Sequence, residues 1–244
     1  MARTAIRSIV LFLGAMAGTG CFAVEKIDPA SVEASGACAS LRIDDFESGD
    51  LLPTSRLFGS WQCGTFNSTG PGEGVSCGVE SSDTGLALAA NFLLRDAPDG
   101  IQSFPAASVN TFVVGKPLDL RRYRWLLFDV RVDSGMPPLP AQASTSFVAT
   151  FGCATAAQRG AANPGEPARV EQSIVIAPHW QSGRLELDNF GQPSEQTNAI
   201  VGGAPSCLEA VDRFEFSIDV PVQDGESAAG TIHLDNIMLY GDCQ

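Results

Sequence analysis

Few residues in this 244-residue chain have the types and spacing that catalysis requires. The segment from Gly74 to Gly78 reads G-x-S-x-G, the pattern around the nucleophile of α/β-hydrolases, with Ser76 as the serine. Such a nucleophile lies at a turn from a strand into a helix, whereas the residues that follow, VESSD, predict no helix. The two histidines, His179 and His233, lack the spacing of paired zinc ligands. We therefore expect a protein that is not an enzyme, with no catalytic residue.

Carboxylates are abundant, with 28 Asp and Glu against 15 Lys and Arg and a formal net charge of −13. No stretch gathers enough basic side chains to neutralise a phosphate backbone, so nucleic acid is not an expected partner. With so many acids, the sequence alone singles out no pair for glycoside hydrolysis. The hydrophobic fraction of 44 % favours a folded domain over a disordered chain or a multi-span membrane protein.

The first twenty residues have the features of an export signal. Arg3 and Arg7 precede the apolar run 9–17, which is shorter than the roughly 20 residues that span a bilayer. The small residues before Cys21 resemble a bacterial lipoprotein signal, in which that cysteine is acylated and becomes the N-terminus. An ordinary signal peptide cut near Ala23 is the alternative. We expect a lipid-anchored protein of the bacterial cell envelope, at the outer membrane or cell surface.

The cysteine count agrees with an acylated Cys21. Without it, six of the seven cysteines remain, an even number that suits disulfides in an oxidising compartment. Six cysteines allow 15 pairings. The six are Cys38, Cys63, Cys77, Cys153, Cys207 and Cys243.

The remaining sequence is typical of short β-strands. From Arg213 to Val220 apolar and polar residues alternate, as in a strand with one buried face. No segment after residue 20 sustains helical periodicity, and no repeat is visible. We predict an all-β antiparallel sandwich or jelly roll as a single domain at 41–244, after a signal peptide at 1–20 and a tether at 21–40. Strands are expected at 41–47, 86–94, 109–114, 123–132, 145–152, 169–177, 183–190, 212–220 and 231–240, and long loops at 48–85, 97–107, 134–144, 156–167 and 191–211.

Two segments at opposite ends of this domain carry a resemblance to a known family. The chain opens on IDDFESGD (43–50) and closes on IHLDNIMLYG (232–241), and between them lie YRWLLFDV (123–130) and APHW (177–180). These motifs resemble the galactose-binding-like jelly rolls, most closely carbohydrate-binding modules of family 11, with the CIA30-type domain as a looser relative. The resemblance covers about residues 41–241 and implies a jelly roll that binds carbohydrate without catalysis.

The resemblance also implies a structural calcium ion between the first and last strands. Glu47 and Asp235 are the implied ligands, with Asp45 as a further candidate and backbone carbonyls completing the shell. Calcium takes six to eight oxygen ligands, and two carboxylates would offset its charge. The alternative is that these acids are surface carboxylates without a metal.

Three disulfides are expected. Cys38–Cys243 would join the paired terminal strands that the resemblance implies, and a register without a bulge would then place Glu47 beside Asp235. Cys63–Cys77 would close the loop between them and stabilise it by about 3 kcal/mol. Cys153–Cys207 is assigned by elimination.

Aromatic side chains decide how well such a domain could bind sugar. Trp125 and Trp180 are expected in the core, which leaves Trp61 and Tyr123 as the exposed candidates for stacking on a sugar ring. Three or more rings clustered on a concave face would favour a glycan, whereas an apolar or small-residue face would favour a protein partner.

These observations lead to two alternative functions. The first is a non-catalytic carbohydrate-binding-like module on an envelope lipoprotein, with polysaccharide or surface glycan as its ligand and the membrane contacted through the N-terminal lipid. The second is a structural or protein-interaction lipoprotein that lacks a sugar site and binds an envelope protein.

Overall fold

The structure is a computed structural model that describes residues 40–66, 74–83, 85–95, 105–139, 146–153, 169–175, 178–190, 208–220 and 226–241. Within these ranges no helix has the length and apolar character needed to cross a membrane. The strands are β1 (Ser40–Asp44), β2 (Gln62–Phe66), β3 (Gly74–Ser82), β4 (Gly85–Arg95), β5 (Ala106–Phe112), β6 (Trp125–Ser134), β7 (Ser146–Cys153), β8 (Arg169–Val175), β9 (Gln181–Glu186), β10 (Val211–Asp219) and β11 (Ser227–Tyr240), with the short 3-10 helix η3 (Leu187–Asn189) after β9.

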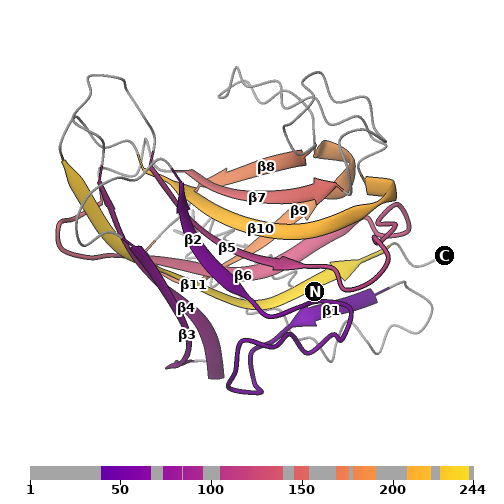
Figure 1. Cartoon of the computed structure of the whole chain (residues 1–244), viewed down its shortest axis with the longest axis horizontal. Coiled ribbons are helices and arrows are strands. Elements are labelled where there is room, and N and C mark those ends of the chain that lie inside the picture. The colour runs from indigo at the N-terminus through magenta and orange to yellow at the C-terminus, as the bar shows by residue number, and fades with distance from the viewer. Residues whose placement is uncertain are drawn as a thin grey trace, which may run out of the picture.

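The strands form two antiparallel sheets packed face to face. The six-stranded sheet has the order β3-β4-β11-β6-β9, with β1 paired to β11, and the five-stranded sheet has the order β2-β5-β10-β7-β8. In Figure 1, β10 and β11 form long arcs bowed in the same direction, with the five-stranded sheet on the inner side of the curve. We call the outer face of the five-stranded sheet the concave face and that of the six-stranded sheet the convex face. The predicted all-β antiparallel sandwich is confirmed.

Aromatic rings fill the space between the sheets. The alternation predicted for β10 is confirmed, because Phe214 and Phe216 are 1 % exposed and face inward. Phe216 packs on Phe128 of β6 and on Phe147 of β7, with ring centroids 5.1 and 5.8 Å apart. Opposite Phe128, Gly183 of β9 leaves the space that this ring occupies. Each such side chain contributes about 1.5–3 kcal/mol through burial.

The expected loop at 48–85 is wrong in its second half, because it contains the strands β2 and β3. Cys63 of β2 and Cys77 of β3 form a disulfide with the Cα atoms 5.9 Å apart, which confirms the expected Cys63–Cys77 pair. β2 is at the edge of one sheet and β3 at the edge of the other. The disulfide therefore fastens the two sheets together at one side of the sandwich.

Candidate functional site

The outer positions of the five-stranded sheet are mainly small and polar, and Ser108, Thr150 and Glu215 among them are buried. Because the inward-facing residues of β10 alternate with outward-facing ones, the outer positions form rows across β5, β10 and β7. The rows, each given in that strand order, are Phe112–Arg213–Gly152, Asn110–Glu215–Thr150 and Ser108–Ser217–Val148. β10 is the middle strand, so Arg213, Glu215 and Ser217 stand at the centres of the three rows.

Two buried donors on this face have no hydrogen-bond partner. Arg213 forms an ion pair with Glu215 at 3.2 Å, and their side chains are 23 % and 8 % exposed. The Nε atom of Arg213 nevertheless makes no hydrogen bond within the described part of the chain, and neither does the Oγ atom of Ser108. Buried polar groups are normally satisfied by protein, water or ligand.

An apolar patch adjoins the Arg213 row. Phe58 and Val113 form a β-bridge and face the core, so their neighbours Leu57, Phe112 and Val114 project from the opposite side of the same ribbon. These three side chains are 40 %, 44 % and 59 % exposed, and they are three of the five exposed large hydrophobic residues in the described ranges. We call Leu57, Phe112 and Val114 the rim patch.

The two expected stacking residues are not exposed, and that expectation is wrong. Trp61 is 2 % exposed because its indole N–H donates to Asp44 over 2.7 Å and its ring packs on Phe46. Tyr123 is 6 % exposed, and the guanidinium group of Arg122 covers its ring at 4.9 Å. Neither ring offers an open face to a sugar. Sequence reasoning missed Phe112, although it lies within the strand expected at 109–114.

The other two tryptophans also differ from expectation. Trp125 and Trp180 are only partly buried, on the convex side of the molecule rather than in the core. Arg184 lies over the Trp125 ring at 3.8 Å, and Arg131 lies over the Trp180 ring at 5.4 Å. Trp180 also packs against His233. Burial lowers the pKa of His233, and the charge of Arg131 lowers it further, so this histidine is neutral at pH 7.

The acids of the opening motif have separate roles at the end of β1. Asp44 is fully buried and accepts hydrogen bonds from the backbone of Phe46, from the backbone and hydroxyl of Thr54, and from Trp61. Burial raises the pKa of Asp44 above its ordinary value, and these hydrogen bonds oppose the rise. The Asp44 carboxylate therefore organises the loop between β1 and β2. Sequence reasoning assigned it no role.

Asp45 is held by a cation instead. Its carboxylate accepts from Arg42 at 2.8 Å and from Thr54 at 2.9 Å. Burial raises the pKa of Asp45, but the hydrogen bonds from Thr54 and Arg42 outweigh it and the pKa lies below its ordinary value.

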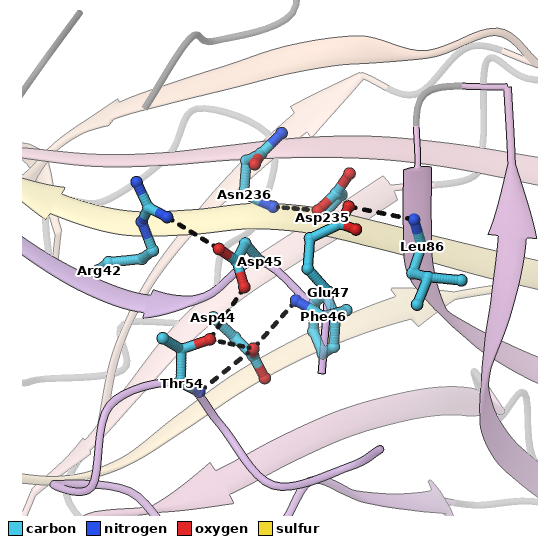
Figure 2. Close-up of polar contacts among 9 residues, drawn as sticks. All are labelled: Arg42, Asp44, Asp45, Phe46, Glu47, Thr54, Leu86, Asp235 and Asn236. Carbon is cyan, nitrogen blue, oxygen red and sulfur yellow. Dashed lines mark hydrogen bonds and ion pairs between the residues drawn. The ribbon is translucent and has the colours of Figure 1, made fainter. Parts of the chain in front are cut away.

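Glu47 is held by β4, the strand that pairs with the Asp235 strand β11. Glu47 reaches from the turn after β1 and accepts a hydrogen bond from the backbone N–H of Leu86 at 3.2 Å, next to Gly85, where a Cβ atom would collide with this carboxylate. The β4–β11 register ends with Leu88 paired to Leu234, the residue before Asp235. Figure 2 shows the Glu47 carboxylate directed toward both Leu86 and Asp235.

A bulge in β11 sets the position of Asp235. The register with β6 shifts between Asp235 and Met238, and Asn236 adopts a φ of 50° there. Asp235 is 1 % exposed and accepts from the Asn236 backbone at 2.7 Å, while the Asn236 side chain donates to Asp129. A second register shift, between Arg42 and Asp44 of β1, contradicts the expected pairing without a bulge.

Within the described ranges, no group of three or more His, Cys, Asp or Glu is placed to hold a metal. The candidate donor set is the two carboxylates of Glu47 and Asp235.

Several expected positions fall outside the described residues. These are Cys21 and the cysteines 38, 207 and 243, together with the side chain of Cys153. The disulfides Cys38–Cys243 and Cys153–Cys207 and the acylation site therefore stay predictions. Ser76 lies in the middle of β3, which leads to β4 rather than to a helix.

Comparison with solved structures identifies the fold. The chain has the jelly-roll fold of family 11 carbohydrate-binding modules. It is similar to the family 11 module of the cellulosomal cellulase Lic26A-Cel5E of Clostridium thermocellum, with a TM-score of 0.50 and 14 % identity over 84 % of this chain and 96 % of that one. A family 11 module of the same organism, solved in complex with a β-1,3-1,4-mixed-linked tetrasaccharide, gives 0.49 and 16 % over 84 % and 97 %. A family 28 module specific for non-crystalline cellulose gives 0.46 and 12 % over 84 % and 96 %. No protein-family model and no curated protein matches the chain.

Proposed function

We propose that the concave face binds a polysaccharide chain and that the protein catalyses no reaction on it. The observation that carries this proposal is the continuity of the rim patch with the rows of polar side chains. A pyranose ring has an apolar C–H face and a rim of hydroxyl groups. Phe112 would contact the first, while Arg213 and Asn110, which are partly exposed, would exchange hydrogen bonds with the second.

Binding of this kind is weak. Phe112, at 44 %, is the one aromatic ring among the well-exposed large side chains of the described ranges, whereas strong sugar binding uses several stacked rings. We expect a dissociation constant in the millimolar range, which corresponds to roughly −4 kcal/mol.

Retention on polysaccharide tests the proposal. Mixed-linked β-1,3-1,4-glucan and non-crystalline cellulose are the first probes. Phe112→Ala should reduce the association constant up to about tenfold, because an aromatic contact contributes about 0.5–1.5 kcal/mol beyond area burial. Leu52→Ala is the matched control, since Leu52 is 60 % exposed outside the rim patch, and it should bind as the wild type does.

One observation favours the second candidate function. The described concave face is built from small residues and carries one exposed ring, which is the arrangement we associated with a protein partner. Failure of every polysaccharide to retain the wild type would replace the first candidate by a structural or protein-interaction domain. Turnover of a glycoside or ester that disappears in Ser76→Ala would refute both.

We also propose that Glu47 and Asp235 hold a calcium ion. The hydrogen bond that holds Glu47 on β4, beside β11 with Asp235, supports the donor set, and both side chains present oxygen, which calcium prefers. Asp45 is not included, because Arg42 and Thr54 already bind it. Bound calcium would offset the two negative charges, while the two residues link the turn after β1 to β11.

An N-terminal lipid on Cys21 is the remaining part of the proposed function. The signal-like sequence and the even number of other cysteines support it. Mass spectrometry of the membrane fraction should find a chain that begins at an acylated Cys21. A mature chain that starts beyond Cys21 and is free in the medium would contradict it.

A further inference from the structure

The convex face carries an apolar cluster where a solvent-facing sheet surface would normally be polar. Two rows across β11 and β6 bring Tyr240 beside Trp125 and Met238 beside Leu127. These four side chains face away from the core, because the alternate residues Leu126 and Leu239 point into it. Trp125, Leu127 and Tyr240 are partly exposed and we call them the convex patch, whereas Met238 between them is 2 % exposed.

Arginines surround this patch. Arg184 of β9 is exposed, lies 3.8 Å from the Trp125 ring centroid and has no carboxylate partner within the described residues. Arg124 lies 5.0 Å from the same ring and pairs with Glu186. Arg42 stands opposite Met238 and pairs with Asp45. Tryptophan, tyrosine and arginine are the side chains that prefer the boundary between water and lipid.

The N-terminal side of the domain begins at this patch. Ser40, the first described residue, pairs with Tyr240, so the chain enters the sandwich at the edge of the convex patch. Figure 1 shows β1 lying beside the end of β11. The tether expected from the sequence joins Cys21 to Ser40, and a random coil of that many residues would span about 25 Å on average. A lipid on Cys21 would hold the patch near the bilayer at high effective concentration.

From these observations we propose that the convex patch lies against the membrane surface and binds anionic lipid headgroups. Phosphate and carboxylate groups of the headgroups would meet Arg184 and Arg124, and the rings of Trp125 and Tyr240 would lie at headgroup level. The convex shape suits a flat, deformable surface better than an extended chain ligand. The rest of this acidic protein, with its formal net charge of −13, is repelled by the same lipids, which favours one orientation.

The inference uses the proposed lipid anchor for its geometry, but the test does not need it. The full chain carrying Cys21→Ser is mixed with vesicles of phosphatidylcholine alone or of phosphatidylcholine with about 30 % anionic phosphatidylglycerol. The vesicles are then sedimented and the bound protein is measured. We expect binding to the anionic vesicles that weakens at high salt. Arg184→Gln should reduce it about fivefold, because one basic residue near such a surface contributes about 1 kcal/mol.

Controls separate this site from the proposed concave one. Arg56→Gln removes the same charge outside the convex patch and should bind vesicles nearly as the parent does. Trp125→Ser should lose vesicle binding and keep its retention on polysaccharide. Equal binding of Cys21→Ser and its Arg184→Gln derivative to anionic vesicles would overturn the proposal. If Trp125→Ser loses its retention on polysaccharide, the convex patch binds a glycan and the membrane proposal is wrong. If light scattering shows that Trp125→Ser changes the oligomeric state, the convex patch binds a second copy of the chain and the membrane proposal is again wrong.

Discussion

Replacing Trp61 by phenylalanine measures how strongly the buried Asp44 carboxylate organises the loop between β1 and β2. The change keeps a ring against Phe46 but removes the indole N–H that donates to Asp44 over 2.7 Å. A hydrogen bond to a charged group contributes about 1.5–3 kcal/mol, and Asp44 has no exposed surface. We expect Trp61→Phe to lower the free energy of unfolding by about 2–3 kcal/mol at pH 7.

The pH dependence distinguishes this hydrogen bond from simple loss of ring volume. Burial raises the pKa of Asp44, so the folded state binds this proton more tightly than the unfolded state. The stability that this group contributes is therefore fully present below the unfolded pKa of about 4 and is lost as the pH rises through the folded pKa. Trp61→Phe removes a bond that favours the charged form and raises the pKa further. Its destabilisation should be larger at pH 7 than at pH 3.5.

Urea denaturation followed by far-ultraviolet circular dichroism gives the required free energies at both pH values. Asp44→Asn supplies the second side of a double-mutant cycle, in which Trp61→Phe should cost much less. An equal cost at both pH values and in both backgrounds would refute the assigned role of the carboxylate, because only the smaller ring would then explain the loss.

Three further predictions concern the calcium site, the disulfide and the core. Chelator should lower the melting temperature of the wild type and leave that of Asp235→Asn unchanged. The wild type should lose about 2.7 kcal/mol of unfolding free energy if calcium had been present at one hundred times its dissociation constant. A wild type that chelator does not affect would count against the site. Reduction of the bond between β2 and β3 should cost about 3 kcal/mol in urea denaturation, since it closes a loop with a sequence separation of 14, and no change would show that the bond does not constrain the unfolded chain. Gly183→Ala should cost about 1–3 kcal/mol, because its Cβ would meet the Phe128 ring. Gly78→Ala, whose Cβ would meet nothing within 4 Å, is its control, and equal melting of the two variants would contradict the packing argument.

The strands that bury one face were predictable from sequence. In β10 the alternate positions Phe214, Phe216 and Ile218 are all buried, as the pattern requires. β2 and β3 were missed because QCGTF and GVSCGVESS contain mostly small and polar residues. Both strands lie at sheet edges. Hydrogen bonds to one neighbouring strand and the disulfide hold them there, so they need fewer of the buried apolar side chains whose alternation predicts a strand.

The site was less predictable than the fold, for reasons visible in particular residues. Residues 109–114 place Val109, Thr111 and Val113 on one side of the strand and Asn110, Phe112 and Val114 on the other. Both sides contain apolar residues, so alternation cannot decide which one faces solvent. Trp61 was expected outside because Trp125 and Trp180 were assigned to the core, yet a hydrogen-bond partner 17 residues earlier in the sequence, Asp44, holds it inside.

The proposed sites lie on opposite faces of one sandwich, and this arrangement has a mechanical consequence. A membrane contact through Trp125 and Arg184 would direct the concave face, with Phe112 and Arg213, away from the bilayer and toward ligands outside. The core rings between the sheets keep the two faces at a fixed separation, and the bond between Cys63 and Cys77 closes one side of the sandwich. The two contacts would therefore be made at once without competing for the same residues. Vesicle-bound protein should keep the polysaccharide retention of the free protein, and its loss on vesicles would show that the two faces are not independent.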